Sequence, residues 1–247
     1  MPRLSRRLRA RVGAVVLTGA LGAAGTALAP PVARATPTAD PTRYFITLGG
    51  TCDPTGSSYD RVDLRGGVRV RVTYPASVGT WLLCNDRVPF QRSVGIGVAA
   101  AREALLATYA RDPQGEFVLV GYSQGAEVVS LLLADIADGK VAVPPAQVRA
   151  KLYADPMQPG TGIGATVPKG LGVPIIDFVS PGPGRTIYAG GIRYTRYCIV
   201  TDGVCDTRRP ILGALGYFTQ HPQYPAKFFG TIADGVYLDA VQWLPKQ

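Results

Sequence analysis

Apolar and polar residues follow two patterns along the chain, one with the period of a strand and one with the period of a helix. Residues 68–74 (VRVRVTY) alternate at every second position, as a half-buried strand does. Residues 117–120 (FVLV) form a continuous apolar run, which is typical of a strand buried on both faces. The same reasoning predicts further strands at 44–48, 151–154, 173–179 and 192–200.

Helical periodicity occurs between these strand candidates. Residues 93–109 place apolar side chains on one stripe, with Ser93 as the expected N-cap and Asp112-Pro113 as the end. Residues 126–137 are apolar on nearly every side, which is typical of a buried helix. Residues 228–243 are expected to form a closing helix. Strands that alternate with helices predict an α/β fold with a mostly parallel sheet covered on both faces.

The N-terminal segment has the features of a secretory signal peptide. Residues 2–12 are rich in Arg, residues 13–29 are apolar, and Ala33-Arg34-Ala35 offers a cleavage site before Thr36. An uncleaved membrane anchor is the alternative, although the apolar run is short for a membrane span. We therefore expect a signal peptide at 1–35 and a single domain at 36–247, secreted from the cell or held in the cell envelope.

The positive charge of the chain is concentrated in this segment. The formal net charge is +9, yet without residues 1–35 the chain has 20 basic and 17 acidic residues. The remaining basic residues are scattered and are not interleaved with aromatic ones, as a site for single-stranded nucleic acid requires. We expect no nucleic-acid partner.

The cysteine count predicts disulfides and argues against a metal site. An even number of cysteines in an exported chain predicts two bridges with three possible pairings of Cys52, Cys84, Cys198 and Cys205. A zinc site is not expected, because the chain has no C-x-x-C spacing and a single His. We expect no metal and no cofactor.

Residues 121–125 (GYSQG) match the G-x-S-x-G pattern of a nucleophilic serine. In that arrangement Ser123 lies on a sharp turn from a strand to a helix, and Gly121 and Gly125 avoid steric conflict with their neighbours. The pattern alone is a weak signal in a chain rich in Gly, and its alternative is a turn with an incidental Ser. It follows the apolar run 117–120 and opens the helix at 126–137, however, which is the setting that a nucleophile requires.

The stretch FVLVGYSQGAEVVS resembles the nucleophile turn of cutinase-like serine esterases, and within them it is most similar to the PE-PPE-domain esterases of actinobacteria. The resemblance runs from about Phe45 to about Tyr224 and is weak in two Gly- and Pro-rich stretches, 159–172 and 181–191. It implies an α/β-hydrolase fold and a Ser-Asp-His triad. It also implies esters of short to medium acyl chains, or lipid-like esters, as substrates.

His221 is the only His of the chain, so any mechanism with a histidine base must use it. It follows the last strand candidate, which fits the order Ser, Asp, His of this fold; an exposed or structural His is the alternative. The segment 197–205 resembles the acid loop of cutinases, which implies Asp202 as the acid between two half-cystines, Cys198 and Cys205. The rival acids are Asp155, Asp177 and Asp206.

The oxyanion donors are expected at two turns. One donor of this fold is the backbone N–H after the nucleophile, which is that of Gln124. Gly49-Gly50-Thr51 resembles the family's Gly-Thr/Ser turn, which implies Thr51 as the second donor; a plain Gly turn is the alternative. If Cys198 pairs with Cys205, Cys52 is left to pair with Cys84, and that bridge would fix the residue beside Thr51.

These features predict a secreted, monomeric serine carboxylic-ester hydrolase that works through an acyl-enzyme. Its expected partners are a small-molecule or lipid ester as substrate and a cell-envelope lipid surface. Two alternatives stay open. The acyl group could pass to a hydroxyl group of a cell-envelope glycolipid instead of to water, or the fold could serve as a non-catalytic cell-wall binding module.

Overall fold

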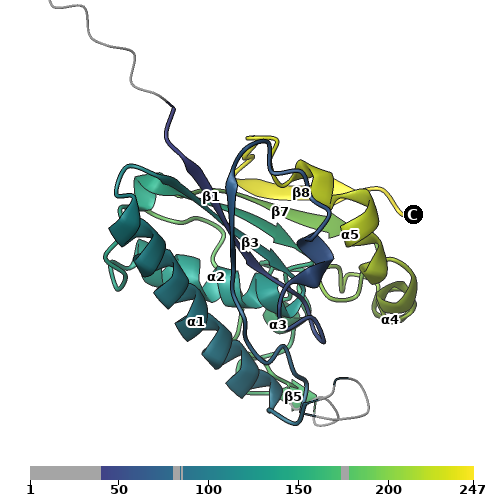
Figure 1. The fold of residues 1–247 in the computed structure, drawn as a ribbon. Coiled ribbons are helices and arrows are strands. Elements are labelled where there is room, and N and C mark those ends of the chain that lie inside the picture. Colours follow the sequence, from purple (N-terminus) through teal and green to yellow (C-terminus); the bar gives the residue numbers. More distant parts are fainter. Residues whose placement is uncertain (1–39, 80–83, 85, 174–177) are drawn as a thin grey trace, which may run out of the picture. The chain divides into compact units, whose positions relative to one another are not determined.

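The computed structural model describes residues 40–79, 84, 86–173 and 178–247; the signal peptide predicted at 1–35 lies outside them. One parallel sheet has the strand order β2-β1-β3-β4-β7-β8 (Figure 1), and the predicted mostly parallel sheet is confirmed. Its strands are β1 (Arg43–Leu48), β2 (Val68–Arg71), β3 (Glu116–Tyr122), β4 (Val148–Tyr153), β7 (Arg193–Ile199) and β8 (Ala240–Leu244).

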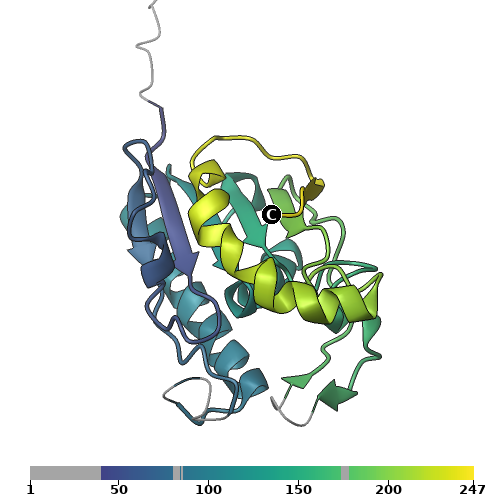
Figure 2. The same ribbon diagram turned by 90° about the vertical axis from the view of Figure 1, so that its right-hand side faces the viewer.

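Helices cover the sheet. They are α1 (Phe90–Arg111), α2 (Gln124–Ala137), α3 (Ile163–Thr166), α4 (Pro210–Thr219) and α5 (Tyr224–Lys227), with 3-10 turns at η1 (Ser57–Tyr59), η2 (Pro145–Gln147), η4 (His221–Gln223) and η5 (Phe229–Thr231). The helices α1 and α2 pack against each other. Figure 2 shows α4 and the C-terminal turns, coloured lime to yellow, in front of the sheet and separated from α1.

The core lies on both faces of the sheet because successive side chains of a strand point to opposite sides. In β3, Phe117 and Leu119 pack with α1 and α2, whereas Val118 and Val120 pack in a second cluster that contains Tyr224 of α5. All four of these β3 side chains are buried. The prediction that the apolar run at 117–120 is a strand buried on both faces is therefore confirmed.

Three predicted elements differ from the structure. The helix α1 begins three residues before Ser93, with Pro89 as its N-cap, so the prediction that Ser93 caps it is wrong. Most of the predicted strand at 173–179 lies outside the described residues; its described ends belong to two short strands, β5 (Gly172–Val173) and β6 (Phe178–Val179), which pair with each other in antiparallel fashion and not with the main sheet. Ser93 is buried inside the helix and uses its hydroxyl for contacts described below.

The closing helix predicted at 228–243 is also wrong. After the turn η5 the chain passes through Gly235 and the positive-φ residue Asp239, and then forms the strand β8. The strand pairs in parallel with β7, where Cys198 lies opposite Trp243. Its stabilising contacts come from a strand far away in the sequence, so local periodicity did not reveal it.

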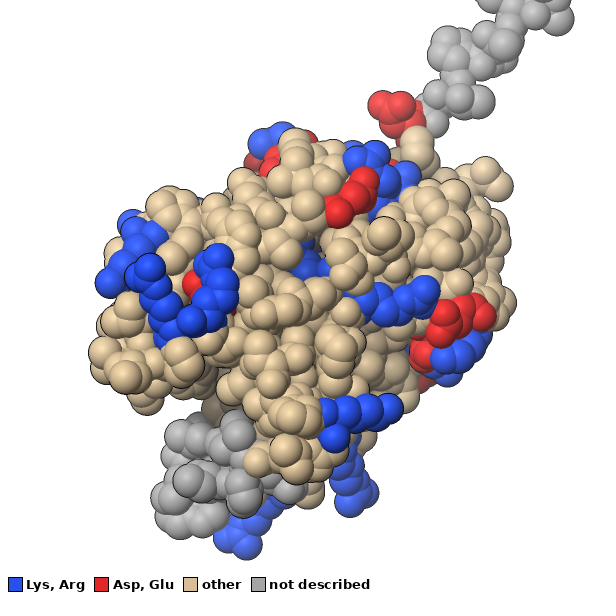
Figure 3. Space-filling model, turned by 180° about the vertical axis from the view of Figure 1, so that it is seen from behind, with Lys and Arg blue, Asp and Glu red and all other residues tan. Residues whose placement is uncertain are grey.

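Charged side chains are spread in small groups over the face seen in Figure 3, with broad uncharged areas between them. Many pair with opposite charges; Asp138, for example, contacts both Lys140 and Arg185. Within the described ranges, no helix is long and apolar enough to cross a membrane.

Candidate active site

The structure brings Ser123, His221 and Asp202 together at the carboxyl end of β3. The Ser123 Oγ lies 2.9 Å from His221 Nε2, and His221 Nδ1 lies 2.9 Å from Asp202 Oδ2 and 3.1 Å from Oδ1. All three residues are buried, and Ser123 retains slight exposure. A carboxylate can only accept hydrogen bonds, so Asp202 selects the tautomer with a proton on Nδ1 and leaves Nε2 to accept from the Ser123 hydroxyl.

Ser123 lies on a strained turn between β3 and α2. Its φ is 56°, in the left-handed region that residues with a side chain rarely adopt. The two flanking glycines permit this turn. A Cβ at Gly121 would overlap the Gly125 carbonyl, and a Cβ at Gly125 would overlap the Gly49 carbonyl at the end of β1. The helix therefore approaches both strands closely, and the serine is held at the N-terminus of α2.

Two tyrosines that the sequence analysis did not single out hold His221. The imidazole stacks against the rings of Tyr122 and Tyr217, whose centroids lie 5.0 Å and 5.2 Å away. The Tyr122 hydroxyl also donates a 2.7 Å hydrogen bond to the His221 carbonyl. Burial raises the pKa of Tyr122, so this phenol stays a protonated donor. The one sequence signal for Tyr122 was its position directly before Ser123 in the G-x-S-x-G motif.

Asp202 lies in a loop closed by a disulfide. The predicted Cys198–Cys205 bridge is present, and the Val204 N–H donates to Asp202 Oδ1 at 3.1 Å. The backbone N–H groups of Cys205 and Asp206 both donate to the Asp202 carbonyl. A compact turn thus holds the carboxylate against His221.

The described rival acids have other partners. Asp155 is fully buried and forms an ion pair with Arg196 at 2.9 Å, and its carboxylate also accepts the Met157 N–H. Asp206 accepts from Arg208 and from the Thr201 N–H, and the arginine holds the pKa of this carboxyl below its usual value. The third rival, Asp177, lies outside the described residues.

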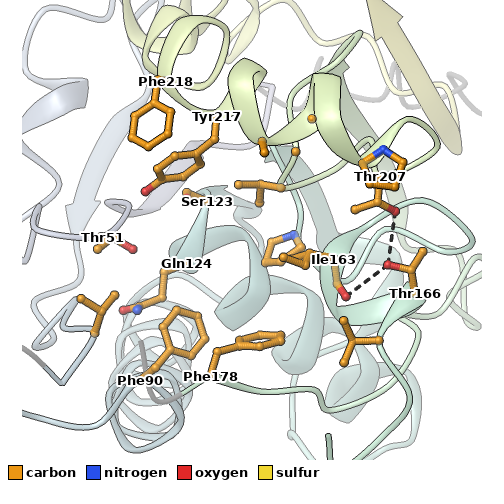
Figure 4. A pocket seen from close by; sticks show the side chains of 18 of the residues that line it. Thr51, Phe90, Ser123, Gln124, Ile163, Thr166, Phe178, Thr207, Tyr217 and Phe218 are labelled. Atoms are coloured by element: carbon orange, nitrogen blue, oxygen red, sulfur yellow. Dashed lines mark hydrogen bonds between the residues drawn. The ribbon is translucent and has the colours of Figure 1, made fainter. Parts of the chain in front are cut away.

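The predicted oxyanion turn lies beside Ser123. A Cβ added to Gly50 would come within 3.2 Å of the Ser123 Cβ, so only a glycine allows this approach without displacement. Thr51, Ser123 and Gln124 line the same cavity (Figure 4). Gln124 is the first residue of α2, and the first N–H groups of a helix have no acceptor within the helix. An N–H group at this end of a helix is of the kind that binds anions.

A short buried segment connects the two turns. The Ala76 carbonyl accepts the Cys52 N–H at 2.8 Å, and the Ser77 carbonyl accepts Gln124 Nε2 at 2.9 Å. The Ser93 hydroxyl joins them, because it donates to Gln124 Oε1 and accepts the Ser77 N–H, both at 3.0 Å. The predicted Cys52–Cys84 bridge is present on the same side. Residues 76–77 therefore fasten both turns to one another.

The serine opens into an apolar cavity of about 870 Å³. Figure 4 shows Tyr217 and Phe218 of α4 on one side and Phe90 and Phe178 on the other. Among the described residues, the polar side chains in its wall are few: Thr51, Ser123, Gln124, Thr166, Thr207 and the hydroxyl-bearing Tyr217. Such a chamber accommodates an apolar chain whose polar group reaches Ser123. The described residues contain no cluster of His, Cys, Asp and Glu that could hold a metal ion.

One buried acid next to the site has no role in this arrangement. Glu127 lies in the first turn of α2, where its side chain is fully buried and the Gln91 side chain is near its carboxyl group. Burial and the nearby Asp155 carboxylate raise the pKa of Glu127 to about 8. The side chain is therefore protonated at neutral pH.

A family model for the PE-PPE domain matches residues 66–212, which is more than half of the chain. The chain belongs to the PE-PPE domain family. The matched part of the PE-PPE domain contains Ser123 and Asp202 and ends before His221. The third residue of the constellation therefore comes from sequence that this match does not include.

Several proteins that are similar to this PE-PPE domain have esterase names. It is 29% identical over 190 residues to a Corynebacterium glutamicum protein named a carboxylesterase Culp6 homolog, a match that spans 69% of this chain and 58% of that relative. The catalytic core domain of an acetyl xylan esterase from Trichoderma reesei superimposes with a TM-score of 0.53 at 23% identity, covering 79% of this chain and 98% of that one.

Another acetylxylan esterase structure superimposes with a TM-score of 0.50 at 20% identity, over 78% of this chain and 97% of that one. These likenesses and the parallel sheet confirm the predicted cutinase-like α/β-hydrolase fold.

Proposed function

We propose that the chain is a serine carboxylic-ester hydrolase. The observation that carries this proposal is the continuous series of hydrogen bonds from Ser123 Oγ through His221 to Asp202, at the wall of an apolar cavity. The carboxylesterase name of the Corynebacterium relative supports the reaction class.

In the proposed reaction Ser123 Oγ attacks the ester carbonyl and His221 Nε2 accepts the hydroxyl proton. The negative charge on the carbonyl oxygen is stabilised by the N–H groups of Gln124 and Thr51 and by the positive end of α2. The intermediate collapses, the C–O bond to the alcohol breaks, and His221 protonates the leaving alcohol. Water then attacks the carbonyl of the acyl-enzyme, with His221 again as the base, and the bond to Ser123 Oγ breaks to release the acid. Asp202 accepts the hydrogen bond from Nδ1 and stabilises the imidazolium.

The substrates of this reaction are esters with an apolar acyl chain of short to medium length, or lipid-like esters. The support is the apolar wall of the cavity, where Phe90, Phe178 and Phe218 surround the space next to Ser123. The hydroxyl groups of a polysaccharide would find few hydrogen-bond partners in this apolar wall, and burying them there would be unfavourable. No metal or cofactor enters any step.

Export from the cell belongs to the proposal. Its support is the signal-peptide pattern at 1–35 together with two disulfides, which persist in oxidising compartments. Expression of the full chain in an actinobacterial host, followed by mass spectrometry of the secreted protein, should give an N-terminus at Thr36. Retention of intact residues 1–35 would contradict it.

The proposal is tested with a fluorophosphonate probe, which labels an activated serine without requiring knowledge of the substrate. We expect stoichiometric labelling of Ser123. Labelling should vanish in Ser123→Ala, slow by at least about a thousandfold in His221→Ala and by at least about a hundredfold in Asp202→Asn. Asp206→Asn is the matched control, because this carboxylate lies in the same loop but contacts Arg208.

Folding of each variant is checked by near-UV circular dichroism. Undiminished labelling in Asp202→Asn would assign the acid elsewhere. No labelling of the folded, disulfide-bonded wild type would overturn the esterase proposal and favour the binding module.

A further inference from the structure

The helix α4 exposes an apolar face beside the cavity. Ile211, Leu215 and Phe218 are 80%, 61% and 77% exposed, and their spacing of four and three residues places them on one side of the helix. We refer to these three residues as the outer face of α4. Isolated exposed apolar residues are common, but a contiguous row marks an interaction site.

Glycines explain why this face points outward. Gly213 and Gly216 are the buried residues of α4, and they pack on the loop that carries Asp202. A Cβ at Gly213 would lie 3.2 Å from the Gly203 Cα, and a Cβ at Gly216 would overlap the Thr201 carbonyl. The helix is thus attached through its backbone. The side chains of Ile211 and Leu215 are not needed for this attachment and remain exposed.

The outer face continues into the cavity. Phe218 belongs to both, and Ala214 and Tyr217 of the same helix also line the cavity. Figure 4 shows Tyr217 and Phe218 side by side above Ser123. A molecule that covers α4 therefore contacts the entrance to the space in front of the nucleophile.

The charge around α4 is positive. Arg208 and Arg209 directly precede the helix, Lys227 follows it at the end of α5, and the sequence has no acidic residue between Asp206 and Asp234. Arg208 is half-exposed although it contacts Asp206 and stacks over the Trp243 ring at 4.0 Å. An apolar row with a basic margin is complementary to a layer of acyl chains with anionic headgroups.

We propose that α4 is a membrane-docking helix whose outer face inserts into the surface of an anionic phospholipid layer. Docking would place the cavity entrance against the lipid, which deepens the proposed function because apolar esters would then enter without crossing water. The binding itself does not rest on that function, since it can be measured in a chain without the nucleophile.

The test measures the partitioning of Ser123→Ala protein onto vesicles by flotation. The protein is purified after secretion, with its N-terminus determined by mass spectrometry. Vesicles of equimolar phosphatidylcholine and phosphatidylglycerol are compared with vesicles of phosphatidylcholine alone. We expect stronger binding to the anionic vesicles and a decrease in binding as the salt concentration rises.

Two variants separate the apolar and the electrostatic contributions. Ile211→Gln with Leu215→Gln should lower the partition coefficient at least about tenfold on both vesicle types, because apolar area is no longer buried. Arg209→Glu should lower it about tenfold on anionic vesicles only. The matched control is Ile187→Gln, because Ile187 is 77% exposed and lies outside α4 and the cavity wall. It should leave binding unchanged.

The same substitutions in the chain with Ser123 intact should leave hydrolysis of a water-soluble short-chain ester unchanged, which shows that the site is folded. The proposal is overturned if the parent protein binds neither vesicle, or if the double variant binds as the parent does. It is also overturned if sedimentation detects a dimer in solution that the double variant abolishes, since α4 would then contact a second copy. Absence of hydrolysis alongside vesicle binding would reject the proposed function alone.

Discussion

His221 has contacts at both ring nitrogens, with two stacked aromatic rings and at its backbone carbonyl. Asp202 and Ser123 fix the plane of the ring, and Tyr122 and Tyr217 fix its position along the perpendicular direction. A general base acts efficiently only when it is held within a fraction of an ångström of its productive position. These tyrosines are positioning residues for the proposed reaction.

Tyr122→Phe removes the hydroxyl that donates to the His221 carbonyl and retains the stacked ring. Loss of one hydrogen bond of this kind corresponds to about twofold to tenfold in rate. We expect kcat for a soluble ester to fall by that factor while KM is unchanged. Tyr153→Phe is the control, because its hydroxyl contacts Thr231; it should lower stability alone. Equal kcat values in Tyr122→Phe and wild type would refute the positioning role.

Glu127 makes the stability of the protein depend on pH. Its pKa is about 8 in the folded protein, against 4.5 for an unperturbed glutamate. The folded chain therefore holds a proton that the unfolded chain releases, so stability decreases as pH rises from about 4.5 to about 8 and then levels off. Glu127→Gln cannot ionise and removes this decrease.

Urea unfolding of Glu127→Gln at several pH values measures the effect. Relative to wild type, the variant should gain a few kcal/mol between about pH 5 and about pH 8. Glu103→Gln changes the same residue type at an exposed position of α1 and should give a curve parallel to that of wild type. A pH-independent difference between Glu127→Gln and wild type would show that the folded pKa is not raised.

At the scale of elements, the contact between α4 and the Asp202 loop links a surface helix to the site. Gly216→Ala would place a methyl group on the Thr201 carbonyl, so the helix or the loop must shift. We expect a stability loss of about 1–3 kcal/mol and slower labelling of Ser123, because Asp202 shifts with its loop. Thermal unfolding and probe kinetics measure the two effects.

Gly95→Ala is the control for that substitution. Gly95 is also inside a helix, and a Cβ there would have no neighbour within 4 Å. This variant should gain about 0.5–1 kcal/mol from helix propensity and label at the wild-type rate. If Gly216→Ala behaved as Gly95→Ala does, the close packing of α4 on the loop would be refuted.

Elements stabilised by their own periodicity were predictable from the sequence, and elements stabilised by distant partners were not. The runs that form β1, β3 and α2 are apolar enough to be recognised alone. The strand β8 is half-exposed and exists because β7 supplies its hydrogen bonds. Ser93 is a residue type that is common at N-caps, but its hydroxyl contacts Gln124 and Ser77. The local sequence pattern does not reveal these contacts.

At the scale of the whole molecule, the hydrogen bonds of the site join residues that are 98 positions apart in the chain, as His221 and Ser123 are. Ser123, His221 and Asp202 could be named in advance because each has a chemical or spacing signature. Tyr217 and the connecting segment at 76–77 could not, because their importance arises only from the neighbours that folding provides. The sequence thus indicated the reacting groups better than the scaffold that positions them.

The attachment of α4 through two glycines has a consequence for how such proteins can diverge. A helix that is fastened by its backbone makes few demands on side chains outside the cavity wall, so those at 211 and 215 can be exchanged while the acid loop keeps its shape. Natural variation or deliberate redesign at these positions would change where the protein works in its environment. The chemistry that it performs there would be inherited unaltered.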